Sequence, residues 1–263
     1  MNRYLAATRY EFSMFLRRRA VWGLTAAVAV LMFLVLRGQA GYLVGEPDAR
    51  LSAVRTAVQV NLLLPLVLGP LLADRLVRDD RLGVAALLDA AAGTGPARLL
   101  GTFTGSFLGA ALPMAALSFG ISVAHLTRYG DVAVLAWTAA TLVSTTVPAM
   151  LFVTAFALTC PLVMPVPVFR VLFVGYWMWG NAMPPDQFPT LSKTVLHPLG
   201  GYVLTAFFDP DGADRWAGPV PHAVLNVMRP EPTAATASLS VGLLLTLAAV
   251  ALTLAARIRS RAS

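Results

Sequence analysis

A series of long apolar stretches constrains this chain more than any other sequence feature. A transmembrane helix needs about 20 predominantly apolar residues, and such stretches occur at about residues 20–36, 56–72, 99–124, 132–158, 167–183 and 234–256. Only 13% of the residues are charged and 57% are hydrophobic, whereas a soluble domain needs about a quarter charged residues. We therefore predict an all-α, polytopic membrane protein with six transmembrane helices, built as a single domain over residues 1–263.

The basic residues predict how the spans are oriented. The net charge is +7, and arginines cluster before the first span, between the second and third spans, and after the last span. Because cytoplasmic loops are enriched in basic residues, we expect both termini in the cytoplasm and a multi-pass protein of the plasma or inner membrane. Excess arginine in such a chain faces anionic lipids. No basic patch outside the spans is interleaved with aromatic residues, so nucleic acid is not an expected partner.

Residues 3–19, before the first span, have the pattern of an amphipathic helix. Phe12 and Phe15 fall among apolar residues on one side, whereas Arg3 and Arg17 fall on the other. Helices of this kind lie in the plane of the membrane interface. We therefore predict an interfacial helix on the inner leaflet. The alternative is a cytoplasmic extension of the first span that has no separate role.

The third predicted span carries Gly101, Gly105 and Gly109 at four-residue spacing. Residues four apart lie on one face of a helix, so this face has no side chains and a neighbouring helix can approach it closely. We predict that the three glycines serve helix packing. The alternative is that this face lines a transport pathway.

Few polar or amphipathic aromatic side chains fall inside the predicted spans. The candidates for a translocation path are Gln59, Asn61, Tyr176, Trp177 and Asn181. Intramembrane polar residues mark pathways in some proteins. In others they hydrogen-bond a neighbouring helix, and aromatic residues can also form an interfacial belt.

The sequence gives no sign of catalytic chemistry. Gly93-Thr94-Gly95 is followed by Pro96 and lacks the lysine of a phosphate-binding loop. Cys160 is the single cysteine, and the three histidines are far apart in the sequence, which leaves no metal-ligand framework. We predict no catalytic, metal or cofactor-binding residue in this chain, and hence no enzyme activity of its own.

Residues 184–233 form the longest predicted non-spanning segment, which the orientation places outside the cell. Within this segment, Leu191–Phe208 is too apolar for a free loop, and Pro198 with Gly200 would break a straight span. We predict a re-entrant or interface-lying helical pair here, because protein contacts can cover a broken backbone at membrane depth.

The cytoplasmic region 74–98 combines charges with an apolar stripe. As a helix it would pair Asp74 with Arg78 and Arg75 with Asp79. Its apolar stripe would contain Val77, Val84, Leu87 and Leu88. Such a helix either docks on a partner protein or lies on the membrane, and the residues alone leave both readings open.

With this layout the chain resembles the permease subunits of ABC-2 type transporters. The motif that carries the resemblance consists of Arg81, Gly83, Leu87-Leu88, Gly95-Pro96-Ala97 and Arg98. The resemblance implies a coupling helix that contacts a separate ATPase, with the contact residues Arg78, Asp79, Asp80, Arg81, Gly83, Leu87, Leu88 and Arg98. It also implies an outer re-entrant element between the fifth and sixth spans. Ala86 stands where family members often have Glu.

The function expected from this resemblance is that of a permease subunit in an ATP-driven exporter. It implies a dimer of permeases, either a homodimer or a heterodimer, together with ATPase subunits that bind ATP and Mg²⁺. The alternative is a membrane scaffold or sensor that moves no solute but is still tied to an ATPase or another partner. The sequence identifies no substrate.

Overall fold

The computed structural model describes residues 3–37, 46–78, 83, 95–212 and 216–262. Within these ranges all regular secondary structure is helical. The α-helices are α1 (Arg3–Leu16), α2 (Arg19–Arg37), α3 (Ala49–Leu72), α6 (Gly95–Tyr129), α7 (Ala133–Thr141), α8 (Val147–Thr159), α9 (Val166–Asn181), α10 (Gly201–Phe207) and α12 (Ala234–Ala262). The shorter elements are the π-helix η1 (Leu142–Thr146) and the 3-10 helices η2 (Cys160–Leu162), η3 (Pro210–Gly212) and η4 (Asn226–Met228).

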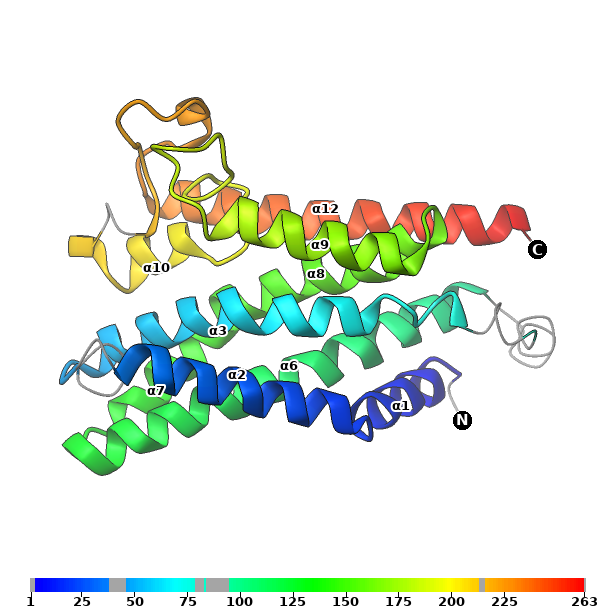
Figure 1. Cartoon of the computed structure of the whole chain (residues 1–263), viewed down its shortest axis with the longest axis horizontal. Helices are drawn as coiled ribbons and strands as arrows, with labels where there is room; N and C mark the ends of the chain where they lie inside the picture. Colours follow the sequence, from blue (N-terminus) through cyan, green and yellow to red (C-terminus); the bar gives the residue numbers. More distant parts are fainter. Residues whose placement is uncertain (1–2, 38–45, 79–82, 84–94, 213–215, 263) are drawn as a thin grey trace.

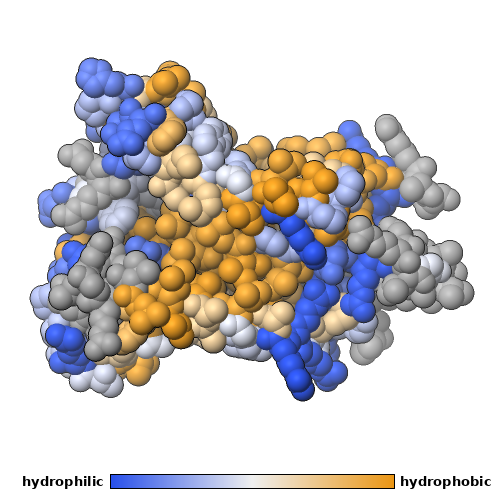
Figure 2. Space-filling view, viewed as in Figure 1, coloured by the Kyte–Doolittle hydropathy of each residue, from blue (hydrophilic) through white to orange (hydrophobic). Residues whose placement is uncertain are grey.

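Four of the described helical runs are long and apolar enough to cross a membrane. They are Ala49–Leu72, Ala97–Tyr129, Ala133–Leu162 and Ala234–Ser260. The prediction of an all-helical membrane protein is confirmed at this level. The apolar stretch of α2, Arg19–Leu34, is shorter, and α9 has 16 residues. Figure 2 shows apolar side chains over the middle of one face and hydrophilic residues toward both ends.

The long helices run lengthwise in one bundle (Figure 1). Both termini lie at the same end, which we call the termini end. From there α2, α6 and α9 run to the opposite end, and α3, the run from α7 to α8, and α12 return. The opposite end carries residues 184–212 and 216–233, which we call the cap. α3 is central to the bundle, because it packs against α2, α6, α7, α8 and α9.

The helix α3 begins earlier than the predicted start at residue 56. Its first residue is Ala49, and the carboxylate of Asp48 accepts hydrogen bonds from the backbone N–H groups of Arg50 (2.8 Å) and Leu51 (3.1 Å). This is an N-cap, which satisfies donors that the first helical turn leaves free. Hydropathy alone missed this turn because it contains charged residues.

The predicted span 132–158 is helical but not a uniform α-helix. The π-helix η1 ends two residues before Pro148. Proline has no N–H to donate, so a helix that contains it adjusts its turn locally. The Thr145 hydroxyl donates to the Thr141 carbonyl at 2.7 Å within this stretch. The span therefore has an irregular turn that carries polar side chains.

Two apolar clusters connect the helices. The larger includes Phe15, Leu64, Leu68, Met114, Met150 and Trp177, which are all fully buried. The second joins the cap to the bundle: Tyr202 and Leu204 of α10 pack with Val54 of α3 and Ala237 of α12. The cap is therefore an integral part of the fold.

The structure differs from the helical pair predicted within Leu191–Phe208. Only α10 is helical, and the residues before Gly200 form turns. Gly200 has a φ of +78°, and a Cβ atom there would lie 2.5 Å from the Cβ of Thr145 in η1. Glycine is required both for this left-handed backbone and for this close approach. The turn thus brings the cap backbone against the irregular part of the bundle.

Candidate functional site

The amphipathic helix α1 lies directly against the first half of α6. The three glycines predicted to serve packing form this contact. A Cβ on Gly101 would lie 2.6 Å from the Cβ of Ala7, and a Cβ on Gly105 would lie 2.5 Å from the carbonyl oxygen of Thr8. Gly109 lies against Phe15 in the same way. The glycines therefore hold α1, a helix that precedes the apolar spans, in backbone contact with α6.

A buried ion pair ties α1 to the end of α3. Arg75 Nη1 lies 3.2 Å from Glu11 Oε2, and the Arg75 side chain has no solvent exposure. The guanidinium carbon of Arg75 also lies 5.2 Å from the centre of the Phe15 ring, a cation–π geometry. Burial lowers the pKa of Arg75, and the neighbouring charge of Arg18 adds to this effect, whereas Glu11 opposes it. Glu11 and Arg75 thus form an ion pair between α1 and the turn after α3, and this pair is shielded from water.

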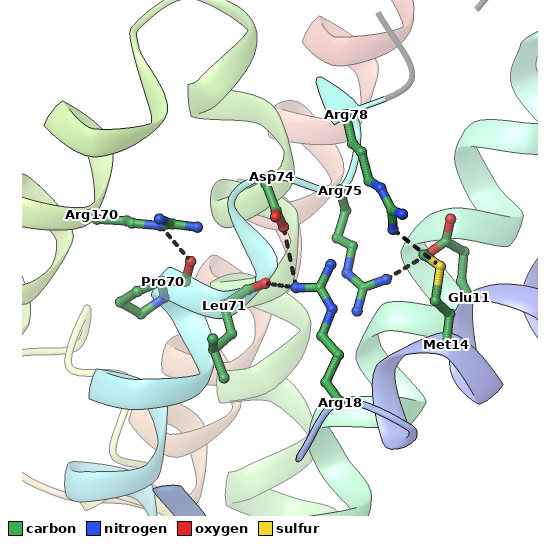
Figure 3. A network of polar contacts seen from close by, with 9 residues as sticks. All are labelled: Glu11, Met14, Arg18, Pro70, Leu71, Asp74, Arg75, Arg78 and Arg170. Atoms are coloured by element: carbon green, nitrogen blue, oxygen red, sulfur yellow. Dashed lines mark hydrogen bonds and ion pairs between the residues drawn. The ribbon is translucent and has the colours of Figure 1, made fainter. Parts of the chain in front are cut away.

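Other charged side chains surround this pair (Figure 3). Arg18 Nη1 lies 3.5 Å from Asp74 Oδ1. Arg78 Nη1 donates to the Met14 sulfur at 3.2 Å. The predicted helical pair of Asp74 with Arg78 is therefore not formed. Residues 73–77 are a turn instead of a helix, and this turn directs Asp74 toward Arg18, just before α2, and Arg78 toward α1.

Most of the predicted ATPase-contact residues lie outside the described residues. They are Asp79, Asp80, Arg81, Leu87 and Leu88. Gly83 is described and has a φ of +67°, which favours glycine. Arg78 precedes this segment, and Arg98 follows it in the first turn of α6. Both flanking residues lie at the termini end of the bundle, and Arg78 contacts Met14 of α1.

The residues predicted for a translocation path are largely engaged in helix contacts. Asn61 Nδ2 donates to Thr145 Oγ1 at 3.2 Å and reaches the Leu199 carbonyl of the cap at 3.5 Å. Trp177 Nε1 donates to the Leu62 carbonyl at 2.8 Å, and Asn181 Nδ2 donates to the Trp177 carbonyl at 2.9 Å. Asn61, Trp177 and Asn181 are buried, whereas Gln59 and Tyr176 are partly buried. The structure thus places Asn61 at a junction of α3, η1 and the cap.

His197 in the cap was not among the predicted site residues. It is buried, and burial lowers the pKa of His197 to about 4; the charges of Arg229 and Lys193 act in the same direction, whereas the nearby Asn181 backbone opposes them. Arg229 is also buried and donates to the carbonyls of Thr190 (2.8 Å) and Ser192 (3.0 Å). The apolar run around His197 was the only sequence signal that this loop is buried.

The described residues contain no group of three or more His, Cys, Asp or Glu side chains placed to hold a metal ion. No protein-family model and no curated protein matches this sequence.

Proposed function

We propose that this chain is the transmembrane permease subunit of an ATP-driven exporter. In this proposal the six spans are α2, α3, α6, the run from α7 to α8, α9 and α12. Both termini lie in the cytoplasm of a plasma or inner membrane. A separate ATPase binds ATP and Mg²⁺ and contacts residues 79–94, and two permeases work together as a dimer.

The observation that supports this proposal best is the buried pair of Glu11 and Arg75. Arg75 lies in the turn that leads into the segment expected to contact the ATPase, and Glu11 lies on α1. Separating the partners of a buried ion pair costs about 3–5 kcal/mol. A displacement of the segment therefore moves the end of α3 and α1 together.

The contact between α1 and α6 extends this linkage to a second span. The Thr8 backbone lies directly against Gly105, so α1 cannot slide across α6 without steric overlap. A force applied after Arg78 is thus transmitted to α3 and, through α1, to α6. This is the kind of rigid coupling that a separate motor subunit requires.

Export also requires that the cap end opens. The contact to break is that of Asn61 with Thr145 and the Leu199 carbonyl. In the described part of the chain Asn61 Oδ1 and Asn181 Oδ1 are buried without a hydrogen-bond partner. A buried polar atom without a partner raises the free energy of the closed arrangement. This cost favours an alternative in which those oxygens contact water or substrate.

The test begins with purification of the full-length chain from its own membrane in mild detergent. A soluble ATPase should copurify in a fixed ratio, and Leu87→Ala with Leu88→Ala should release it or reduce hydrolysis at least about tenfold, because two apolar interface contacts contribute about 2–4 kcal/mol. Val163→Ala with Val168→Ala is the matched control, since both valines are exposed near the same end.

Two results would contradict the proposal. If no ATPase copurifies and a different protein does so in a fixed ratio, the scaffold or sensor function replaces transport. If the ATPase binds but no solute changes its rate of hydrolysis in reconstituted vesicles, the chain is a partner of the ATPase without being a permease.

A further inference from the structure

One face of α3, between α2 and α9, is apolar and only partly covered (Figures 1 and 2). Its side chains, at helical spacing, are Leu62, Leu63, Leu66, Val67 and Leu71, and all are partly buried against the larger apolar cluster. We call them the α3 stripe. α2 and α9 each pack on α3, and Gly69 at one edge of the stripe lies against Phe173 of α9. The two neighbours flank the α3 stripe, and its side chains remain partly exposed between them.

Arg18 and Arg170 each reach a backbone carbonyl at the termini end of the α3 stripe (Figure 3). Arg170 Nε donates to the Pro70 carbonyl at 3.1 Å, and Arg18 Nη1 reaches the Leu71 carbonyl at 3.5 Å. These carbonyls lie in the last turn of α3, where the helix leaves acceptors free and the dipole favours cations. Each guanidinium has five N–H donors, so donors remain after these contacts. The carboxylate of Asp74 lies 3.5 Å from Arg18 and balances the positive charge of that one arginine.

Among the described residues, basic side chains outnumber carboxylates around this point, even with Asp74 and Glu11 counted. Arg17 and Arg19 flank Arg18 in the sequence and are exposed, and Arg170 is exposed as well. Basic side chains at the headgroup level attract anionic lipids. A zwitterionic headgroup carries no net charge to balance them, so this cluster favours a lipid with net negative charge.

The length of the α3 stripe matches one leaflet of a membrane. From Leu62 to Leu71 the helix rises about 14 Å, and the hydrocarbon of one leaflet is about 15 Å thick, half of a core of about 30 Å. An acyl chain that starts at the arginines would therefore cover the whole stripe before it reaches the membrane centre. The apolar and the charged parts of the site have the relative positions of the two parts of one phospholipid.

We propose that the α3 stripe, Arg18 and Arg170 together bind one anionic phospholipid from the leaflet at the termini end. The phosphate lies between the two guanidinium groups, and an acyl chain lies on the α3 stripe between α2 and α9. The inference rests on membrane embedding and these contacts and does not depend on ATP-driven transport.

The experiment uses the full-length chain in detergent and measures retained lipid by native mass spectrometry. The probes are phosphatidylglycerol and phosphatidylcholine with identical acyl chains. The wild-type chain should retain one phosphatidylglycerol with at least about tenfold preference over phosphatidylcholine. Arg18→Gln with Arg170→Gln should remove this preference. Arg257→Gln with Arg259→Gln removes the same charge from the same end of the bundle, on α12, and should leave it unchanged.

A second variant tests the acyl-chain part of the site. Leu66→Trp fills the middle of the α3 stripe without changing any charge, and it should lower phosphatidylglycerol retention at least about threefold. If the arginine variant does not fold, the Leu66→Trp variant still tests whether the α3 stripe binds the lipid. Equal retention of both lipids by the wild-type chain would overturn the proposal, as would loss of the preference in the α12 control.

Two further measurements separate other occupants. Displacement of the bound lipid by inorganic phosphate alone would indicate a site for free anions and overturn the lipid assignment. In a Cys160→Ser background, Leu66→Cys should remain monomeric under oxidising conditions in membranes. Efficient disulfide-linked dimers would show that a second copy covers the α3 stripe instead of lipid.

Discussion

The two ends of the bundle hold their buried arginines in different ways. At the termini end, charged side chains from different helices meet, as Glu11 of α1 does with Arg75 after α3. In the cap, Arg229 donates to backbone carbonyls of the cap itself, at Thr190 and Ser192. The first arrangement links helices that are distant in the sequence. The second stabilises one irregular segment. A displacement of helices at the termini end should therefore spread to other helices, whereas a displacement within the cap should remain local.

The strongest way to break this contrast is to separate α1 from α6. Gly105→Leu places a side chain where a Cβ alone would lie 2.5 Å from the Thr8 carbonyl oxygen. Because backbone atoms cannot yield as a flexible side chain can, we expect a loss of at least about 3 kcal/mol in the docking of α1. Hydrogen exchange of the α1 amides should rise at least about a hundredfold, while exchange in the cap stays unchanged.

Gly120→Leu is the matched control for this prediction. Gly120 lies on the same helix, and nothing approaches within 4 Å of a Cβ built there. The control should exchange like the wild-type chain. Slow α1 exchange in the Gly105→Leu variant would show that α1 can shift across α6, and the linkage proposed for this end would then fail.

The next prediction tests the ion pair. Glu11→Gln leaves the Arg75 guanidinium buried without its carboxylate, and we expect a cost of about 3 kcal/mol. Replacing both partners, as Glu11→Gln with Arg75→Met, should cost less than the sum of the two single changes, because no unpaired charge then stays buried. Thermal unfolding in detergent measures all three variants. Additive costs would mean that the two side chains do not interact energetically.

The cap should instead respond to pH. His197 has a pKa of about 4 in the fold against an ordinary value of 6.5, so the unfolded chain binds this proton more readily. Stability is therefore fully present above pH 6.5 and is lost as the pH falls toward 4. Between pH 7.5 and pH 5 the loss should be about 2 kcal/mol.

The measurement is hydrogen exchange of the α10 amides as a function of pH. His197→Asn should remove most of the pH dependence, whereas His222→Asn, at an exposed position of the same segment, should keep it. If α1 responds to pH as strongly as the cap does, the two ends are not independent. A response confined to the cap would sharpen the contrast between them.

The helical membrane class was predictable from the sequence because apolar composition is a property of whole segments. Gly101, Gly105 and Gly109 were also predictable as packing residues from their spacing. That α1 is their neighbour was not predictable, since spacing on one helix says nothing about which other helix lies against it. The pairing of Glu11 with Arg75 was equally unpredictable, because the two residues are distant in the sequence. The local helical spacing predicted Asp79 as the partner of Arg75 instead.

For the cap, the sequence indicated burial but not the backbone conformation. Its burial was indicated by an apolar run, yet the predicted helical pair within Leu191–Phe208 was wrong in form. Backbone groups in turns here are satisfied by Arg229 and by Tyr202, whose hydroxyl donates to the Pro230 carbonyl at 3.0 Å. Such long-range side-chain contacts have no signature in local propensity, so only the three-dimensional arrangement reveals them.

The smallest expected effect concerns the start of α3 at the cap end of the bundle. Asp48→Ala removes the carboxylate that accepts the N–H groups of Arg50 and Leu51, and loss of an N-cap of this kind costs about 1 kcal/mol. Because Arg55 pairs with Glu46 at 2.8 Å across the same turn, the helix should fray locally without disturbing the bundle. Exchange of the first α3 amides should rise about fivefold, and Asp48→Asn, which keeps an acceptor oxygen, should restore most of the protection. An effect that reaches the α1 amides at the other end would mean that α3 transmits displacement from both of its ends, and the contrast between the termini end and the cap would then have to be abandoned.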